Sequence, residues 1–359
     1  MKVLVVRTDR LGDLVLSLPV FEYIKTRRPA WEVHALVAPG SVPLVENNPH
    51  ITAVWTWNDA GTPAEHADLE RRLAAEGFTA VVLLQYRHAL AALMHRAQIP
   101  RRLGPLSKMS SWFLLNRGSW QARSRGRRHE LTQNLRLARR LIEGWPADWK
   151  RDARDHPEPQ LYLTDGQREI GRRFLAVEAA GAGTVAFVHP GSGGSALDWE
   201  PARFAGVANA LGRQPGWRVF VTGSAADTAT VAAMKPHLSA NVEILLDRYP
   251  LRDFLGIVAA GDLFVGPSTG PLHIAAALGT AAVGLYPPVV TMSPDRWGPR
   301  GPWSRAVTPD VKCPSRRTCF MERCIEYNCM DRIREQDVLA RCLAVVNIRR
   351  KALDDHHPA

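Results

Sequence analysis

The sequence has no long hydrophobic run. Although 46% of its 359 residues are apolar, no apolar stretch reaches the roughly 18 residues that suggest a membrane-spanning helix. Only four apolar residues separate Lys2 from Arg7, too few for the hydrophobic core of a signal peptide. We therefore expect a cytoplasmic protein, long enough for two domains of ordinary size.

Several common ligand motifs are also missing. The chain contains neither a GxGxxG fingerprint nor a GxxxxGK[ST] loop, and no DxD-type acidic pair is placed to bring a magnesium ion. Cysteine is scarce, and four of the five cysteines, Cys313, Cys319, Cys324 and Cys329, fall within seventeen residues without any CxxC pair. Free thiols are the favoured interpretation in a reducing compartment, and a structural zinc or iron ion held by the four stays open.

Acidic residues are almost absent from one long stretch, the window from His95 to Arg140. It holds twelve cations against Glu130 alone, and this difference of eleven equals the formal net charge of +11 of the whole chain. The cations are Arg96, Arg101, Arg102, Lys108, Arg117, Arg123, Arg125, Arg127, Arg128, Arg136, Arg139 and Arg140. Arginine favours forked contacts to carboxylate or phosphate, and interleaved tryptophans make the stretch amphipathic. We expect it to bind an anionic partner; a solvated basic surface is the alternative, and nucleic acid is disfavoured because no known binding module accompanies the charge.

Short apolar runs alternate with helix-type periodicity, and the alternation occurs twice. In the first half we expect strands at 3–6, 33–37, 53–57 and 80–84, with helices at 14–24 and 131–142. A polar hinge follows near 146–159. In the second half we expect strands at 185–189, 218–222, 242–246, 263–266 and 281–286, with helices at 203–213, 227–237, 252–260, 271–278 and 335–350. Right-handed crossovers would make both sheets parallel.

One turn in the second half is typical of an anion site. A strand that ends at Gly266 runs into Pro267-Ser-Thr-Gly-Pro-Leu-His273. Ser268 or Thr269 suits an N-cap, and Pro271 suits the first helical turn, where no N–H is needed. The N–H groups and the positive end of the helix dipole would then face a ligand beyond the strand. A well-capped helix without a ligand is the alternative.

The first strand leads into a second candidate site, the loop Thr8-Asp-Arg-Leu-Gly-Asp13. Asp13 would lie at the carboxyl edge of that strand, where open α/β sheets place their ligands. Its alternative role is that of an N-cap.

These segments together resemble glycosyltransferase family 9, the heptosyltransferases of lipopolysaccharide core synthesis. The motifs are Arg7-Thr-Asp-Arg-Leu-Gly-Asp13 with Pro19, His189-Pro-Gly-Ser-Gly-Gly194 with Trp199, Val221-Thr-Gly-Ser224, Ser268-Thr-Gly-Pro-Leu-His273 and Cys329-Met330. The resemblance implies an α/β fold of two Rossmann-like domains (GT-B) with parallel sheets and a cleft between them. It also implies inverting, metal-independent transfer of heptose or a related sugar from a nucleotide sugar, usually ADP-heptose, to an anionic acceptor of the lipopolysaccharide-core type. The expected domains are residues 1–160 for the acceptor, 161–334 for the nucleotide sugar, and a terminal helix and tail, 335–359, that pack back on the first domain.

The resemblance also assigns roles to residues. Asp13 would be the catalytic base that takes the proton of the acceptor hydroxyl, and no cofactor or metal is expected. The donor-binding residues would be Gly12, Ser192, Gly193, Gly194, Asp227, Ser268, Thr269, Gly270, Pro271, Leu272 and His273. The acceptor-binding residues are expected from position, because the basic stretch belongs to the N-terminal half and the nucleotide loops to the C-terminal half; they are Arg10, Arg123, Arg125, Arg127 and Arg128. Asp227 would accept the ribose hydroxyls, or else cap its own helix, and His273 would contact the donor, or else be a structural histidine. The acceptor implies peripheral contact with the cytoplasmic face of the inner membrane.

Two positions depart from the family pattern. Leu197 stands where the family commonly has a lysine that would neutralise the donor diphosphate, and Ser268 stands where several heptosyltransferases have an aspartate. Without that lysine, the diphosphate would rely on the turn at Thr269, the glycine-rich loop and an arginine such as Arg10 or Arg296, or the donor would differ. Two rival functions remain, a two-Rossmann nucleotide-sugar epimerase and a non-catalytic basic adaptor for membranes or nucleic acid.

Overall fold

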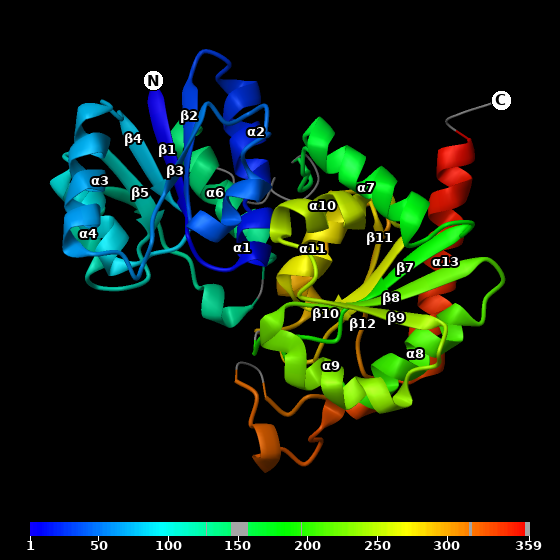
Figure 1. Cartoon of the computed structure of the whole chain (residues 1–359). Helices are drawn as coiled ribbons and strands as arrows, with labels where there is room; N and C mark the ends of the chain where they lie inside the picture. The colour runs from blue at the N-terminus through cyan, green and yellow to red at the C-terminus, as the bar shows by residue number, and fades with distance from the viewer. Residues whose placement is uncertain (127, 145–156, 195, 316–317, 356–359) are drawn as a thin grey trace. The chain divides into compact units, whose positions relative to one another are not determined.

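The protein consists of two compact units (Figure 1). The computed structural model describes residues 1–126, 128–144, 157–194, 196–315 and 318–355. The first unit comprises Met1–Arg123 and Arg128–Tyr162, and the second comprises Ser124–Arg127 and Leu163–Ala359. In the part of the chain that the structure describes, no helix is long and apolar enough to cross a membrane.

The first unit is built on a six-stranded, entirely parallel sheet. Its strands are β1 (Lys2–Arg7), β2 (Glu32–Val37), β3 (Ala53–Thr56), β4 (Ala80–Leu83), β5 (Arg101–Pro105) and β6 (Arg117–Ser119). Their order in the sheet is β3-β2-β1-β4-β5-β6. Because β1 and β4 are buried along almost their whole length, they show the continuous apolar runs of central parallel strands.

Helices follow most of these strands. They are α1 (Leu11–Val15), α2 (Leu18–Arg27), α3 (Pro63–Ala75), α4 (His88–Arg96), α5 (Ser111–Leu114) and α6 (Glu130–Glu143), with 3-10 turns at Pro39–Leu44 and Arg123–Arg125. Thr62 begins α3 with a capping box that includes Glu65.

Two expectations for the first unit were incomplete. The single helix expected at 14–24 is two helices, because Pro19 lies in the first turn of α2 and leaves no N–H for a helix continuing from α1. The basic window contains two strands, β5 and β6, that were not foreseen. Their few residues mix arginine and glycine with apolar side chains, so no alternating pattern marks them.

The second unit repeats the same topology. Its strands are β7 (Thr184–Val188), β8 (Trp217–Gly223), β9 (Val242–Leu246), β10 (Leu263–Pro267), β11 (Ala281–Leu285) and β12 (Ser304–Val307). The sheet order is β12-β11-β10-β7-β8-β9, again all parallel. Counted within each unit, both sheets have the order 3-2-1-4-5-6 of the Rossmann fold. The expected pair of parallel Rossmann-like sheets is confirmed.

The helices of the second unit are α7 (Asp165–Val177), α8 (Pro201–Gly212), α9 (Thr228–Met234), α10 (Leu251–Ala260), α11 (Gly270–Ala277), α12 (Pro294–Trp297) and α13 (Glu335–Asp354). Short 3-10 turns lie at Ala225–Asp227, Lys235–His237, Met321–Arg323 and Cys329–Arg332. Helix α7 was not foreseen, although Thr164 and Gln167 form a capping box at its start.

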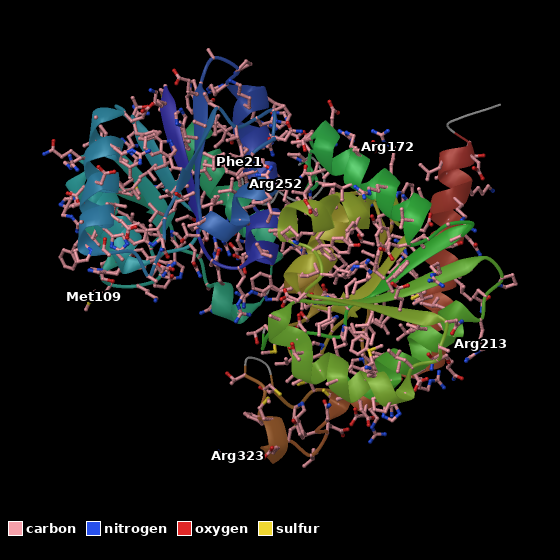
Figure 2. The ribbon with its side chains drawn as sticks, viewed as in Figure 1. Phe21, Met109, Arg172, Arg213, Arg252 and Arg323 are labelled. Carbon is pink, nitrogen blue, oxygen red and sulfur yellow. The ribbon has the colours of Figure 1, made fainter. Side chains whose placement is uncertain are left out.

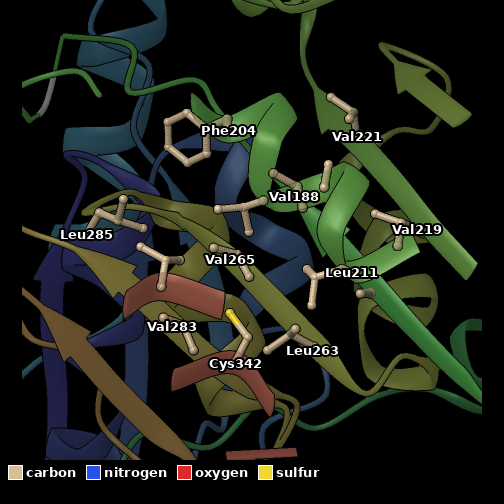
Figure 3. Packing of buried hydrophobic residues seen from close by; sticks show 14 of the residues in the cluster. Val188, Phe204, Leu211, Val219, Val221, Leu263, Val265, Val283, Leu285 and Cys342 are labelled. Atoms are coloured by element: carbon tan, nitrogen blue, oxygen red, sulfur yellow. The ribbon is translucent and has the colours of Figure 1, made fainter. Parts of the chain in front are cut away.

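The terminal helix corrects one expectation. Helix α13 was expected to pack on the first domain, but its buried stripe lies in the core of the second unit, against α8 and strands β10 to β12. The stripe is Val338, Cys342, Val345 and Val346, at the spacing of one helix face. Figure 3 shows Cys342 among valines and leucines of the central strands. Because this face is apolar and the sheet beside it is apolar, the helix covers its own unit.

Candidate functional site

Each sheet has a switch point, the place where the strand order reverses. In the first unit it lies between β1 and β4, and in the second between β7 and β10. Ligands of open α/β sheets bind beyond the carboxyl ends of the strands at such points. The loops that follow β1, β7 and β10 are the segments singled out in the sequence, so each unit has candidate site residues of its own.

In the first unit, a buried cation organises the loop after β1. The side chain of Arg7, the last residue of β1, is only 2% exposed. Its Nη2 donates to Asp13 Oδ1, its Nε donates to Asp9 Oδ1 at 2.6 Å, and its Nη1 lies 3.4 Å from Glu130 Oε1. Arg123 also donates to Glu130. Two guanidinium groups therefore face the three carboxyl groups of Asp9, Asp13 and Glu130. When all three are ionised, the cluster carries one excess negative charge.

The carboxyl of Asp13 has a raised pKa in this cluster. Burial raises the pKa of its carboxyl to about 6; the Arg7 guanidinium opposes this shift, and the carboxylates of Asp9 and Glu130 add to it. Asp13 does not cap its helix, because α1 begins one turn earlier with Arg10 at the N-cap. The capping alternative is therefore wrong, whereas a carboxyl whose pKa is near neutrality suits a general base. Gly12 is buried beside it in α1.

In the second unit, the turn after β10 opens a helix as expected. Thr269 is the N-cap of α11, with Gly270 and Pro271 as the first helical residues. The Thr269 side chain makes no capping hydrogen bond and donates instead to the Pro267 carbonyl at 3.4 Å. Leu272 and His273 are buried in the first turn, so backbone N–H groups are what this end of the helix offers to an anion.

Ser268, one of the two departures from the family pattern, is held at this turn. Its side chain hydrogen-bonds to Tyr286, a buried tyrosine that follows β11 and whose hydroxyl donates to the Trp297 carbonyl at 2.8 Å. The serine is neutral and engaged with a neighbouring hydroxyl, whereas an aspartate there would add a negative charge.

The glycine-rich loop after β7 contacts the loop after β8. Gly193 and Gly194 both have positive φ values, 53° and 69°, which L side chains rarely adopt. Ser192 is buried and its Oγ accepts from the N–H of Gly194 at 3.2 Å. Gly191 lies so close to Asp227 that a Cβ built on it would be 1.8 Å from Oδ1. The two loops therefore meet at this glycine and this carboxylate.

Asp227 is buried and does not cap α9 through its side chain. Its Oδ2 accepts from the N–H and the hydroxyl of Ser224, both at 2.8 Å, which fixes the turn after β8. Beneath it, His189 Nδ1 lies 3.2 Å from Thr222 Oγ1, and burial lowers the pKa of this histidine while Asp227 opposes the shift. The lowered pKa favours the neutral imidazole, whose hydrogen bond is to Thr222.

Leu197, the second departure, is buried and packs in the core of the second unit with Trp199. Both the Leu197 side chain and the residues around it are apolar. This position therefore supplies no cation to a ligand. Arg296 is half-buried in α12, with its guanidinium 4.7 Å from the centre of the Trp297 ring.

The arginines of the basic window divide into two groups. Arg102 donates to the carbonyls of Leu114 and Ile99, at 2.7 and 2.8 Å. Arg123, expected to bind the acceptor, is 15% exposed and engaged with Glu130 and Gln121. These two arginines bond to groups of the first unit and stabilise its fold. The basic window is therefore not one continuous anion-binding surface, as had been expected. Arg10 and Arg125 are exposed, Arg128 is half-buried, and Arg127 lies outside the described residues, as does Ser195 of the glycine-rich loop.

The clustered cysteines are free thiols and line one small cavity. Burial raises the pKa of Cys329 to about 11, with Cys319, Cys313 and Cys324 adding to the shift. Among the described residues, no three His, Cys, Asp or Glu side chains are arranged to hold a metal ion.

Two contributors were missed in the sequence. Arg7 was noted as the first residue of a family motif and given no role, yet it donates to Asp13. Arg87, which follows β4 at the same switch point, makes a forked pair with Asp59, both bonds at 2.7 Å, and donates to Thr8 Oγ1 at 3.2 Å. Both arginines lie at the carboxyl ends of the two central strands, and this position in the sequence could have marked them as site residues.

Two Rossmann-like units, each with a six-stranded parallel sheet, match the GT-B fold of glycosyltransferases. The chain matches the model of glycosyltransferase family 9 (heptosyltransferase) over residues 66–328. It belongs to that family and is a glycosyltransferase, which sets aside the epimerase and the non-catalytic adaptor.

Relatives and solved structures agree with this assignment. A protein of Haemophilus influenzae described as a glycosyltransferase is 27% identical over 83% of this chain and 86% of its own length. Lipopolysaccharide heptosyltransferase 2 of Salmonella typhimurium is 24% identical over 82% and 84%. The family 9 glycosyltransferase of Veillonella parvula superposes with a TM-score of 0.82 at 17% identity, covering 96% of this chain and 97% of that one. The heptosyltransferase WaaC of Escherichia coli with ADP gives 0.69 at 18% identity, covering 96% and 100%. These similarities make the protein a distant relative of the lipopolysaccharide heptosyltransferases with the same fold.

Proposed function

We propose that this glycosyltransferase moves heptose, or a related sugar, from ADP-heptose to an anionic acceptor of the lipopolysaccharide-core type at the cytoplasmic face of the membrane. The observation that carries the proposal is the buried Asp13 carboxyl, whose pKa is about 6 and which lies at the carboxyl edge of β1. The relatedness to lipopolysaccharide heptosyltransferase 2 and to a heptosyltransferase with bound ADP supports the choice of donor and acceptor.

The donor would be held by the second unit. The N–H groups at the start of α11 would donate to the diphosphate oxygens, and the loop with Ser192, Gly193 and Gly194 would contact the same group. Asp227, fixed through Ser224, would accept the ribose hydroxyls. The helix terminus would stabilise the departing nucleoside diphosphate without a metal ion.

The acceptor would be activated by the first unit. Asp13 would take the proton of the attacking hydroxyl as the new bond to the anomeric carbon forms, which gives inversion in a single displacement. Arg7 would keep the Asp13 carboxylate ionised and fixed. Arg10, Arg125 and Arg128 are the remaining candidates for contacts to acceptor phosphates or acidic sugars, together with Arg127.

A nucleotide panel followed by a transfer assay tests this function. Thermal shift with ADP, UDP, GDP and CMP should show the largest stabilisation with ADP. Purified protein should then release ADP from ADP-heptose only when a heptose-deficient core acceptor is added. If only another nucleotide stabilises the protein, the donor is a sugar linked to that nucleotide and not ADP-heptose. Release of free sugar without any transfer to the acceptor would overturn the proposal.

A further inference from the structure

Four large apolar side chains of the first unit are exposed near one edge of its sheet. Met109, Trp112, Phe113 and Trp120 have exposed fractions of 76%, 61%, 80% and 63%. We call these four residues the apolar tip. Single exposed hydrophobic residues are common, but an exposed group of this kind, with two tryptophans, marks a surface that contacts something else.

Hydrogen bonds hold the tip together. Strand β6 pairs with β5, and the Ser119 carbonyl accepts from the N–H of Leu106 at 3.0 Å, immediately before Trp120. The carbonyl of the same Leu106 accepts from Trp112 Nε1 at 3.0 Å. The Trp112 ring is thus bonded to Leu106, and the backbone that leads into Trp120 is bonded to the same residue. The exposed position of Trp112 is therefore held by the folded turn.

The turn that carries Met109 is anchored in the same way. Buried Ser111 donates through both its N–H and its hydroxyl to the Lys108 carbonyl, and the N–H of Trp112 donates to Met109. The hydroxyl of Tyr86, in the loop after β4, donates to Ser110 Oγ at 2.9 Å. The turn therefore lies at the carboxyl edge of the sheet, the edge that also carries Asp13. Figure 2 labels Met109 at the periphery of the first unit.

The charge around the tip has one sign. Lys108 and Arg117 are exposed beside it, and the sequence has no aspartate or glutamate between Glu76 and Glu130. A second exposed apolar group, Phe320, Met321, Ile325 and Tyr327 of the second unit, differs because Glu322 and Glu326 alternate with it. Among the residues that the structure describes, the apolar tip differs from this second group by combining tryptophan, phenylalanine and methionine with an unopposed positive rim, the pattern of an interfacial membrane contact.

We propose that the apolar tip is a membrane-docking surface that inserts among the headgroups of a bilayer containing anionic phospholipid, with Lys108 and Arg117 on the headgroup phosphates. The inference deepens the proposed function, on which it rests for the location of the acceptor in a membrane. Docking would bring the Asp13 edge of the first unit to the lipid surface.

Vesicle binding without donor or acceptor tests the surface independently of catalysis. The full-length protein is sedimented with vesicles of phosphatidylcholine alone or with 30% phosphatidylglycerol, at about 50 and about 300 mM salt. We expect stronger binding to the anionic vesicles, weakened at high salt because screening lengths fall below about 10 Å. Equal binding to neutral and anionic vesicles, or none to either, would overturn the proposal.

Matched variants locate the contact. Trp112→Ser with Phe113→Ser should weaken partition at least ~tenfold, since each ring loses its apolar contact. Ile325→Ser removes an even more exposed apolar residue of the second unit and should not. Lys108→Glu and Arg117→Glu should each cost about fivefold or more, while Arg213→Glu, an exposed arginine of α8's C-cap, should cost little. Because Trp112 also makes a hydrogen bond, Phe113→Ser alone is the fallback if the double variant misfolds.

The remaining outcomes separate this proposal from the proposed function. Transfer to an acceptor dispersed in detergent should be nearly unchanged in Phe113→Ser, while transfer to acceptor in vesicles should fall. If wild-type transfer is absent in both formats but vesicle binding behaves as expected, the function fails and the surface stands. If light scattering shows that the tip variants convert a dimer to a monomer without changing vesicle binding, the tip contacts a second copy and the proposal is wrong.

Discussion

The guanidinium of Arg7 donates directly to the carboxylate of Asp13, and both side chains are almost withdrawn from solvent. Arg7 ends β1 and Asp13 lies in the first turn of α1, so the pair closes the loop between strand and helix. Asp9 and Glu130 share the same guanidinium, which leaves Asp13 incompletely neutralised. Burial is the largest cause of its raised pKa, and the shared cation does not cancel it.

Replacing this carboxyl should separate catalysis from binding. We expect Asp13→Asn to lower turnover by roughly two to four orders of magnitude, because the amide cannot accept the acceptor proton. Donor affinity, measured by calorimetry, should stay near that of the wild type, since the nucleotide loops belong to the second unit. Asp68→Asn serves as the control, because Asp68 is an aspartate of α3 whose side chain is 48% exposed and pairs with Arg71 on the same helix. A folded Asp13→Asn protein with most of its turnover would rule out the base.

The pH dependence should report the same group. Because the base is active only when ionised and burial raises its pKa to about 6, kcat/KM should fall about tenfold per pH unit below that value and level off above it. The free energy of unfolding should change in the opposite sense. A raised carboxyl pKa means that the folded state binds the proton more tightly, so Asp13 costs stability progressively as pH rises from about 4 to about 6. Asp13→Asn should lack that part of the slope in denaturant titrations at several pH values.

Replacing Arg7 should shift the acid side of the pH-rate profile. Lysine keeps the charge of Arg7 but not its fork, so Arg7→Lys cannot reach Asp9, Asp13 and Glu130 together. We expect a higher Asp13 pKa, an acid limb shifted to higher pH, and a lower melting temperature. A pH-rate profile that does not move in a folded variant would mean that Arg7 only supports the structure.

The phosphate turn can be tested with one added side chain. Gly270→Val should weaken ADP binding roughly tenfold or more, because Cβ and its methyls would occupy the space through which oxygens approach the N-terminus of α11. Gly166→Val is the matched control, since a Cβ at Gly166 meets nothing nearer than Thr164 Oγ1 at 3.9 Å. Unchanged ADP affinity in folded Gly270→Val, by calorimetry, would place the diphosphate elsewhere.

Asp227 can be tested against the ligand group it would contact. Asp227→Asn should reduce affinity for ADP about tenfold or more, the range for a hydrogen bond to a charged group. It should have little effect on 2′,3′-dideoxy-ADP, because the ribose hydroxyls are already absent. Equal losses for both nucleotides would show that the carboxylate acts only by holding Ser224 and its turn.

The parallel sheets and the two ligand turns could be predicted from the sequence, because these features depend on local patterns. The apolar runs of β1, β7 and β10 are buried on both faces, so they read as continuous hydrophobic segments. The helix start is predicted by the residue types of a single turn, Thr269, Gly270 and Pro271. Strands β5 and β6 could not be found in this way, because they lie toward the edge of the sheet and their side chains follow no simple alternation.

Only the tertiary structure decided which charges are buried together. Arg7 and Glu130 are 123 residues apart, and no local pattern says that they meet, or that Arg123 neutralises Glu130 while Arg10 stays exposed. The same holds for α13, whose apolar stripe could be recognised in the sequence but whose partner surface could not. Local sequence fixes backbone propensity and capping within a few residues, whereas burial and the pKa of Asp13 depend on side chains that only the folded chain brings into contact.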